Sequence, residues 1–280
     1  MNIADISSYQ GDIDWSKARR KLDMVIFRAS IGNKIDTRYI FNAKQCGLPF
    51  GVYHYFKAST KEEAETEAVF FHAAATQEEL KPLFFCLDIE HNTQTSENTQ
   101  IICQTILNTL RLLGAKKVGL YIGQSRYPYI RDIKNTFDFI WIPRYGKNTG
   151  LADEAYAPKF PCDIWQYTSV GHVDGIPNYV DLNKLYGNKD LKWFTEDGLI
   201  IEPPLKRSLF FLQWITVRKG DNNGAVQELQ QVLNELGYNC GRKDGIFDSA
   251  TEKALKQYQK QNGLTADGIC GKKTLTKLIG

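Results

Sequence analysis

Two acidic side chains stand one residue apart at the end of an apolar run, Leu83-Phe84-Phe85-Cys86-Leu87-Asp88-Ile89-Glu90. Successive side chains of a β-strand point to opposite faces, so an extended segment places Asp88 and Glu90 on the same face. Like charges held close together under partial burial raise the proton affinity of one carboxylate, which is what a general acid needs near neutral pH. Taken alone, the pattern also fits two solvated loop carboxylates or a pair that caps a helix.

Cleavage of a glycosidic bond requires an acid that protonates the leaving oxygen and a second carboxylate that supports the oxocarbenium-like sugar. We assign Glu90 as the acid and Asp88 as its partner. Asp5 and Asp181 lie in the first and last predicted strands, which become neighbours when a barrel closes. We therefore expect four carboxylates to converge on one cavity.

The elements that would position these acids are short β-branched or aromatic runs, which alternate with helix-compatible segments up to Gly187. Such alternation predicts repeated βα units around a parallel sheet, here an irregular TIM-like (β/α) barrel over residues 1–187. Reactive groups of such barrels lie at the carboxyl ends of the strands. The eight predicted strands are Ile3–Ser8, Met24–Ser30, Phe50–Phe56, Leu83–Glu90, Val118–Gly123, Phe139–Tyr145, Cys162–Thr168 and Val180–Tyr186.

Helices are predicted between the strands, and the last connections look shorter and less helical. Several strand ends also carry side chains suited either to sugar contacts or to simple barrel packing. The predicted helices are Asp14–Leu22, Tyr39–Cys46, Lys61–Thr76, Glu97–Leu113 and Gln124–Asn135. The candidate sugar contacts are Tyr53, Tyr55, Tyr121, Trp141, Gln166 and Tyr167.

The periodic pattern breaks over a connector, residues 188–213, which contains Pro203-Pro204. Its apolar runs, 199–201 and 209–212, predict that it packs against other parts of the protein. Residues 214–280 then repeat an Asp-Gly-Ile turn, beginning at Asp244 and at Asp267, before each of two predicted helices. We expect a small all-α domain of three helices, with Ser249 and Glu252 as a capping box.

Charge and composition exclude some functional classes. The net charge of +3 is too small for a nucleic-acid-binding protein, and no run approaches the ~20 apolar residues of a membrane span. The excess lies after residue 213, where ten Lys and Arg accompany seven Asp and Glu, so an anionic partner would suit this part weakly. The start, MNIADISSYQ, lacks the features of a signal peptide, which predicts synthesis in the cytoplasm without membrane insertion.

Cysteine and histidine patterns argue against a disulfide framework or a metal site. The six cysteines form no CxxC pair and have mostly apolar neighbours, so we expect free, buried thiols. The four histidines form neither HExxH nor a zinc-spaced cluster. We predict no metal and no cofactor.

Five motifs occur in order, each at the end of a predicted strand, and together they closely resemble glycoside hydrolase family 25, the lysozymes of phage endolysin and bacterial autolysin type. The resemblance spans about residues 2–187. It implies hydrolysis of the β-1,4 bond between N-acetylmuramic acid and N-acetylglucosamine, with Asp5, Asp88, Glu90 and Asp181 at the four acidic positions and Glu90 as proton donor. The motifs are Asp5-Ile6-Ser7-Ser8-Tyr9-Gln10-Gly11 with Asp14-Trp15, Tyr53-His54-Tyr55, Leu87-Asp88-Ile89-Glu90, Trp165-Gln166-Tyr167-Thr168 and Val180-Asp181-Leu182-Asn183.

Carboxylates two residues apart on one strand do not easily flank a sugar from opposite faces. This favours substrate assistance, in which the N-acetyl group of the sugar attacks the anomeric carbon while Asp88 orients it. An inverting route stays open. Two rival functions also remain: a catalytically silent wall-binding protein, and a hydrolase of the same fold that acts on another N-acetylated glycan such as chitin.

The last part of the chain, from about residue 215, resembles the peptidoglycan-binding type 1 domain. Its motifs are Val217-Arg218-Lys219-Gly220-Asp221, Asp244-Gly245-Ile246-Phe247 and Asp267-Gly268, with Asp248 where such domains usually have Gly. The resemblance implies that bacterial peptidoglycan is the partner of both parts. An endolysin-like muramidase of this kind would reach the wall after release by a separate lytic factor. The sequence does not indicate an oligomeric state.

Overall fold

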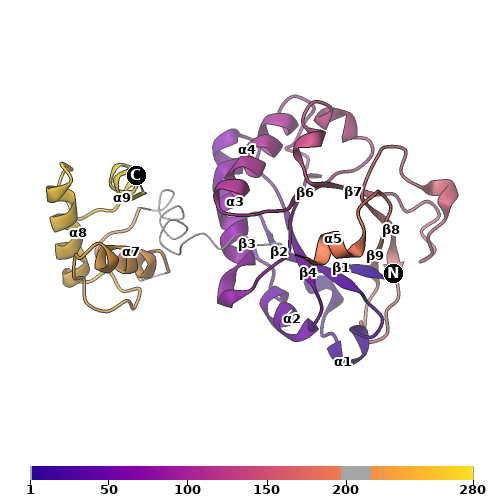
Figure 1. Cartoon of the computed structure of the whole chain (residues 1–280), viewed down its shortest axis with the longest axis horizontal. Coiled ribbons are helices and arrows are strands. Elements are labelled where there is room, and N and C mark those ends of the chain that lie inside the picture. The colour runs from indigo at the N-terminus through magenta and orange to yellow at the C-terminus, as the bar shows by residue number, and fades with distance from the viewer. Residues whose placement is uncertain (1, 197–215, 223, 280) are drawn as a thin grey trace. The chain divides into compact units, whose positions relative to one another are not determined.

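The computed structural model describes residues 2–196, 216–222 and 224–279. The chain divides into two compact units, Met1–Ile200 and Ile201–Gly280. The first unit is a ring of strands with helices outside it, and the second is a small group of helices (Figure 1).

The first unit is a closed barrel of eight strands, which confirms the predicted fold class. Strand β9 pairs with β1 and β1 pairs with β2, so the sheet has no open edge inside the ring. A ninth, two-residue strand, β3 (Lys34–Ile35), forms a hairpin with the end of β2. In order around the barrel, the strands are β1 (Ile3–Ile6), β2 (Met24–Ile31), β4 (Phe50–Tyr55), β5 (Phe85–Asp88), β6 (Val118–Tyr121), β7 (Phe139–Pro143), β8 (Ile164–Gly171) and β9 (Val180–Leu185).

The last strand departs from the prediction of a parallel sheet. Strand β9 runs antiparallel to both β8 and β1, so the prediction is wrong for this strand. Only residues 172–179 join β8 to β9, and a parallel crossover needs a dozen residues or more. As a consequence β9 begins, rather than ends, at the rim where the parallel strands finish.

Helices cover the outside of the first half of the barrel: α1 (Trp15–Ala18), α2 (Tyr39–Cys46), α3 (Lys61–Ala75) and α4 (Thr99–Leu112). The predicted helix Gln124–Asn135 is wrong, since this segment forms two short 3-10 turns, Tyr127–Ile130 and Lys134–Thr136. Pro128 explains the difference. It has no N–H to bond the carbonyl four residues earlier, and it disfavours helical geometry at the preceding residue.

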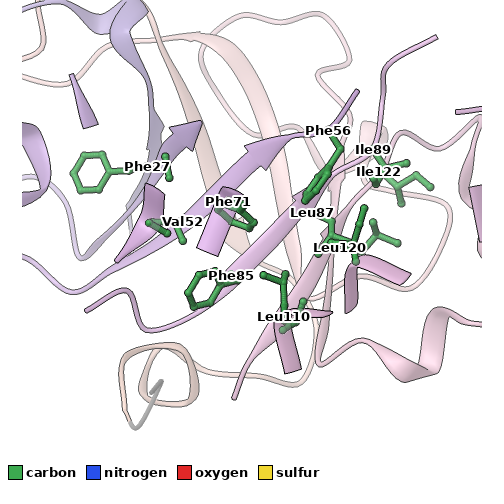
Figure 2. Packing of buried hydrophobic residues seen from close by; sticks show 14 of the residues in the cluster. Phe27, Val52, Phe56, Phe71, Phe85, Leu87, Ile89, Leu110, Leu120 and Ile122 are labelled. Carbon is green, nitrogen blue, oxygen red and sulfur yellow. The ribbon is translucent and has the colours of Figure 1, made fainter. Parts of the chain in front are cut away.

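Two layers of apolar side chains hold the barrel together. The outer layer lies between strands and helices, where Val52 and Phe85 from the sheet meet Phe71 of α3 and Leu110 of α4 (Figure 2). The inner layer fills the barrel. It consists of the side chains that alternate with those of the outer layer along each strand and therefore point to the opposite face of the sheet. Its members include Ile3, Met24, Ile26, Phe84, Cys86, Phe139, Trp141 and Ile164.

A short helix, α5 (Leu191–Thr195), closes the end of the barrel at which the parallel strands begin. Its Phe194 is fully buried, with ring centroids 5.6 Å from Phe84 and 5.2 Å from Phe139. The start of the predicted connector therefore packs into the barrel. The apolar runs 199–201 and 209–212 lie outside the described residues. With this end filled, the inner side chains are accessible at the opposite rim.

In residues 216–222 and 224–279, the described part of the second unit, there are three helices, α7 (Gly224–Glu235), α8 (Ser249–Gln261) and α9 (Lys272–Ile279), which confirms the predicted all-α domain. The predicted capping box at Ser249 is wrong. The carboxylate of Asp248 caps α8 by accepting from Thr251 N, and Glu252 forms ion pairs with lysines instead. An ionised carboxylate one residue earlier is the better acceptor for the free N–H groups of the first turn.

The repeated turns of this unit are organised around two buried glutamines. The side-chain amide of Gln230 donates to three oxygens and accepts from one backbone N–H, and Gln259 repeats the same four bonds one helix later. Gln230 bonds Asp244, Ile246, Thr251 and Gly245, at 2.9–3.2 Å. Gln259 bonds Asp267, Ile269, Thr274 and Gly268, at 2.9–3.1 Å.

All six cysteines are buried and free, as predicted. Within the described part of the chain, no helix is long and apolar enough to span a membrane. The same residues contain no group of three or more His, Cys, Asp or Glu side chains arranged to hold a metal ion.

Candidate active site

A polar cavity of about 170 Å³ opens at the rim where the parallel strands end. It brings together the four predicted acids and four of the six predicted sugar contacts. Larger cavities of about 700 and 580 Å³ lie elsewhere in this unit, but neither contains any of the four acids. The residues that line the polar cavity are Asp5, Tyr53, Asp88, Glu90, Tyr121, Trp141, Tyr145, Gln166 and Asp181.

Strand register explains why the acids meet. Asp5 of β1 lies directly opposite Asp181 of the antiparallel β9. Asp88 ends β5, and Glu90 follows two residues later on the same side of the chain. Asp88 is buried at the base, whereas Glu90 is exposed at the rim, so Glu90 is accessible to a ligand that enters the cavity.

Asp5 is held by two side-chain amides. Its Oδ2 accepts from Gln166 Nε2 at 2.9 Å and from Asn183 Nδ2 at 2.8 Å. The amide oxygens are occupied in turn, since Asn183 Oδ1 accepts from Trp141 Nε1 and Gln166 Oε1 accepts from the hydroxyls of Tyr121 and Tyr145. Both amides are thereby oriented with their donors toward Asp5. Burial raises the pKa of Asp5 to about 6, and these hydrogen bonds oppose that rise.

Asp181 faces Asp5 and behaves differently. Burial, followed by the negative charge of Asp5 and a hydrogen bond with it, raises the pKa of Asp181 to about 8. Near neutral pH the proton of this pair therefore lies on Asp181, and Asp5 carries the charge. The pair supplies one fixed negative charge to the cavity.

The pKa values of the second acidic pair, Asp88 and Glu90, are raised as well. Burial and the nearby charges of Glu90 and Asp5 raise the pKa of Asp88 well above its usual range. Partial desolvation raises the pKa of Glu90, and the positive charge of Arg126 opposes this. The Oδ1 atom of Asp88 is buried with no hydrogen-bond partner among the described residues. Buried polar atoms normally have partners, so a free acceptor at the base of a cavity suits a donor from a ligand.

Residues 4–176, more than half of the chain, match the family model described as glycosyl hydrolases family 25. The chain belongs to glycosyl hydrolase family 25. This confirms the predicted family and the predicted enzyme class, a glycosidase. Over 98% of its length the family 25 enzyme is 26% identical to the autolytic lysozyme of Clostridium acetobutylicum, of which the match covers 77%.

A solved structure supports the same assignment for the barrel. The catalytic domain of endolysin Ply40 from bacteriophage P40 of Listeria monocytogenes matches with a TM-score of 0.60 at 30% identity, covering 66% of this chain and 93% of that one. Residues 222–278 match the model of a putative peptidoglycan binding domain. Over 53 residues the chain is 49% identical to the N-acetylmuramoyl-L-alanine amidase CwlM of Mycobacterium tuberculosis, covering 19% of this chain and 13% of that protein.

The loop that follows Glu90 in this family 25 enzyme is fixed by Arg126. The Nη1 atom of Arg126 donates to the carbonyl oxygens of His91 at 2.9 Å and Gln94 at 2.7 Å. The buried amide of Gln94 donates in turn to Phe56 O at 2.9 Å. Arg126 thus both orients the loop that carries Glu90 and places a positive charge near its carboxylate.

Two predicted sugar contacts do not line the cavity. Tyr55 is half-buried at the rim, with its ring 5.9 Å from that of His91. Tyr167 neighbours Gln166 on β8 and therefore points to the opposite face, where its ring lies 6.2 Å from that of Trp165.

Sequence reasoning missed two residues of the site, Asn183 and Tyr145. Asn183 lies two residues after Asp181 and so shares its face, a signal that strand alternation offered. Tyr145 follows the end of β7 and offered no comparable signal, because its position depends on the loop after the strand.

Proposed function

We propose that this glycosidase is a muramidase, which hydrolyses the β-1,4 bond between N-acetylmuramic acid and N-acetylglucosamine in bacterial peptidoglycan, with Glu90 as general acid. The observation that carries the proposal is the convergence of Asp5, Asp88, Glu90 and Asp181 on one cavity at the rim of the barrel. The relatives named as an autolytic lysozyme and an endolysin support this choice of substrate.

In the first step, the glycosidic C–O bond breaks while its oxygen takes the proton of Glu90. The carbonyl oxygen of the neighbouring N-acetyl group forms a new bond to the anomeric carbon, giving an oxazolinium ion. The unpartnered Oδ1 of Asp88 is suited to accept the N–H of that group and orient it. In the second step, water opens the oxazolinium ion and returns a proton to Glu90, so the anomeric configuration is retained.

The remaining residues of the cavity bind and stabilise. The charge of Asp5, fixed by two amides, faces the sugar on which positive charge develops. The protonated carboxyl of Asp181 is a hydrogen-bond donor at neutral pH. We propose that Tyr53, Tyr121, Trp141 and Gln166 contact the sugar, and that Tyr55 contacts it at the rim.

The second unit, here called the helical module (residues 216–279), would hold the enzyme on its insoluble substrate. A tethered barrel experiences a high effective concentration of glycan, so modest affinities combine into avidity. Deletion of residues 215–280 should reduce sedimentation with purified walls much more than cleavage of soluble glycan fragments. Equal losses of both would contradict the tethering role.

The test of the proposed activity is digestion of purified Gram-positive peptidoglycan by the wild type and by Glu90→Gln, with chemical identification of the new ends. New reducing N-acetylmuramic acid ends from the wild type alone would support the proposal. Absence of turnover by the wild type would favour the silent wall-binding protein, and preferred cleavage of chitin would favour another N-acetylated glycan as substrate. An initial product of inverted configuration, observed by NMR, would exclude substrate assistance.

A further inference from the structure

Two large aromatic side chains are exposed beside the cavity and are not explained by the mechanism. Tyr9 is 75% exposed and Tyr179 is 58% exposed. Tyr9 lies in the 3-10 turn Ser8–Gln10 that follows β1, and Tyr179 immediately precedes β9. Exposed aromatic rings on neighbouring loops at the mouth of an active site suggest a contact surface for a ligand.

The ring of Tyr9 rests on a buried ion pair. The guanidinium carbon of Arg28 lies 5.1 Å from the centre of the ring. Arg28 is held in place by Asp36, at 2.9 Å from Nε and 2.8 Å from Nη2, and by Ser8 Oγ at 3.1 Å. The side chain of Asp36 is completely buried. One face of Tyr9 is thus supported by a rigid cation, while most of the ring remains exposed to solvent.

The loop of Tyr179 is fastened to the loop of Tyr9 by reciprocal hydrogen bonds. Gln10 Nε2 donates to Tyr179 O at 3.0 Å, and Asn178 Nδ2 donates to Tyr9 O at 2.9 Å. The ring of Tyr179 lies 4.8 Å from that of His172. The two tyrosines therefore belong to one pre-ordered surface, and binding to it would cost little conformational entropy.

This surface adjoins the cavity on the side of β1 and β9. Tyr179 directly precedes β9 and lies two residues before Asp181, which lines the cavity. In the barrel order, β9 is four strands away from β5 in either direction, so the surface lies across the cavity from the strand that leads to Glu90. Tyr55 and His91 form a second aromatic pair on that far side.

We propose that Tyr9 and Tyr179 form a saccharide-binding surface, on which a pyranose ring of the glycan stacks after the chain leaves the cavity. The inference rests on the proposed function. The cavity, about 170 Å³, is smaller than typical ligand pockets of 300–1,000 Å³, so a polymer must continue onto the rim. Arg28 and Asp36 neutralise each other beneath the ring, which favours an uncharged sugar over a charged stem peptide.

The test compares short peptide-free glycan oligosaccharides, which fill only the cavity, with long ones. Tyr9→Ala and Tyr179→Ala should each lower the ratio of kcat/KM for long to short substrates by about three- to tenfold, the range expected for one aromatic stacking contact. Tyr9→Phe should keep the wild-type ratio because it retains the ring. Tyr186→Ala is the matched control, since this exposed tyrosine follows the end of β9 at the opposite end of the barrel.

A second readout separates this inference from the proposed activity. Calorimetric titration of full-length Glu90→Gln with a long oligosaccharide should show binding that weakens by the same factor when Tyr9→Ala is added. An unchanged ratio in both alanine variants, or equal losses on short and long substrates, would overturn the saccharide-binding surface while leaving the muramidase proposal intact. If the wild-type protein cleaves neither substrate, and Tyr9→Ala still weakens binding of the long oligosaccharide, the proposed activity would be wrong. The saccharide-binding surface would then still be supported.

Discussion

Acidic side chains behave in opposite ways in the two units. At the barrel mouth, burial raises the pKa of all four acids, from Asp5 to Asp181. In the helical module, hydrogen bonds from backbone N–H groups lower the pKa of Asp244, Asp248 and Asp267. The module uses carboxylates to cap turns and helices, which stabilises its fold. The barrel crowds them together, which costs stability and retains protons that chemistry can use.

Buried amides show the same contrast. Gln230 and Gln259 form hydrogen bonds with the backbone of turns and with neighbouring side chains of the module. Gln166 and Asn183 both donate to one carboxylate, Asp5, inside the cavity. In the helical module the hydrogen-bonded amides stabilise the fold, whereas in the barrel they hold a negative charge at the place where a substrate would bind.

The largest expected effect separates the two kinds of acid. Asp88→Asn should lower kcat by about 10²–10³-fold, because a neutral amide is a weaker acceptor for the N–H of the N-acetyl group than the carboxyl group that orients it, and it should not lower the Tm of the barrel. Asp244→Asn, the control in the module, should leave kcat on soluble fragments unchanged. Kinetics on such fragments and calorimetry check both variants. Wild-type activity of Asp88→Asn would contradict the proposed difference between the acids of the barrel and those of the module.

A stability effect of intermediate size is expected in the module. Gln230→Leu removes four hydrogen bonds from a buried site and should lower the free energy of unfolding of the module by about 2–4 kcal/mol, at about 1 kcal/mol for each bond. Gln227→Leu, on the exposed side of the same helix, should change it by less than about 0.5 kcal/mol. Denaturant titration distinguishes them. Equal effects would mean that the buried glutamine does not organise the turn.

A smaller effect concerns pH. The pKa of Asp181 rises from its ordinary 3.8 to about 8, so between these values the unfolded chain releases a proton that the folded protein keeps. The contribution of this bound proton to the free energy of unfolding is fully present below about pH 4 and is lost as the pH rises toward 8. Asp181→Asn lacks it, so the Tm of the variant relative to the wild type should increase from pH 4 to pH 8, by about 2–4 °C per kcal/mol.

The difference in Tm is the informative quantity here. Burial lowers the pKa of His54, and a lowered histidine pKa makes wild-type stability rise with pH, against the trend of Asp181. His54 is present in both proteins, so its contribution cancels in the difference. A Tm difference that stays constant or shrinks from pH 4 to pH 8 would contradict the proton assignment.

The smallest effect tests Arg126. Its charge lowers the pKa of Glu90, so Arg126→Gln should shift the alkaline limb of the kcat/KM profile upward, by about one pH unit or less. Arg126→Lys keeps the charge but loses the two-carbonyl contact of the guanidinium, so kcat should fall while the limb stays in place. A shift of the limb in the lysine variant alone would reverse these roles.

Much of the site was predictable because it depends on strand alternation and barrel closure. From the sequence alone, these two rules place Asp88 beside Glu90 and bring Asp5 to Asp181, as the cavity shows. Two predictions were wrong for local reasons. Pro128 interrupts a predicted helix, and the short connection after β8 makes β9 antiparallel to its neighbours.

Contacts between strands were harder to predict than the faces of single strands. The bond from Trp141 to Asn183 joins residues 42 positions apart, and it depends on a register that no single segment specifies. Tyr145 lies in a loop, where alternation does not apply. The buried support of Tyr9 likewise depends on Arg28 and Asp36 from a different strand and loop.

The central claim is that Glu90 delivers a proton to the leaving oxygen. The most direct measurement is the dependence of Glu90→Gln on the leaving group. On a natural glycosidic bond the variant should lose about 10²–10⁴-fold in kcat/KM, the usual contribution of a general acid, but on an aryl glycoside whose leaving group needs no proton it should stay close to the wild type. Equal losses on both substrates, or full activity on the natural bond, would contradict the account.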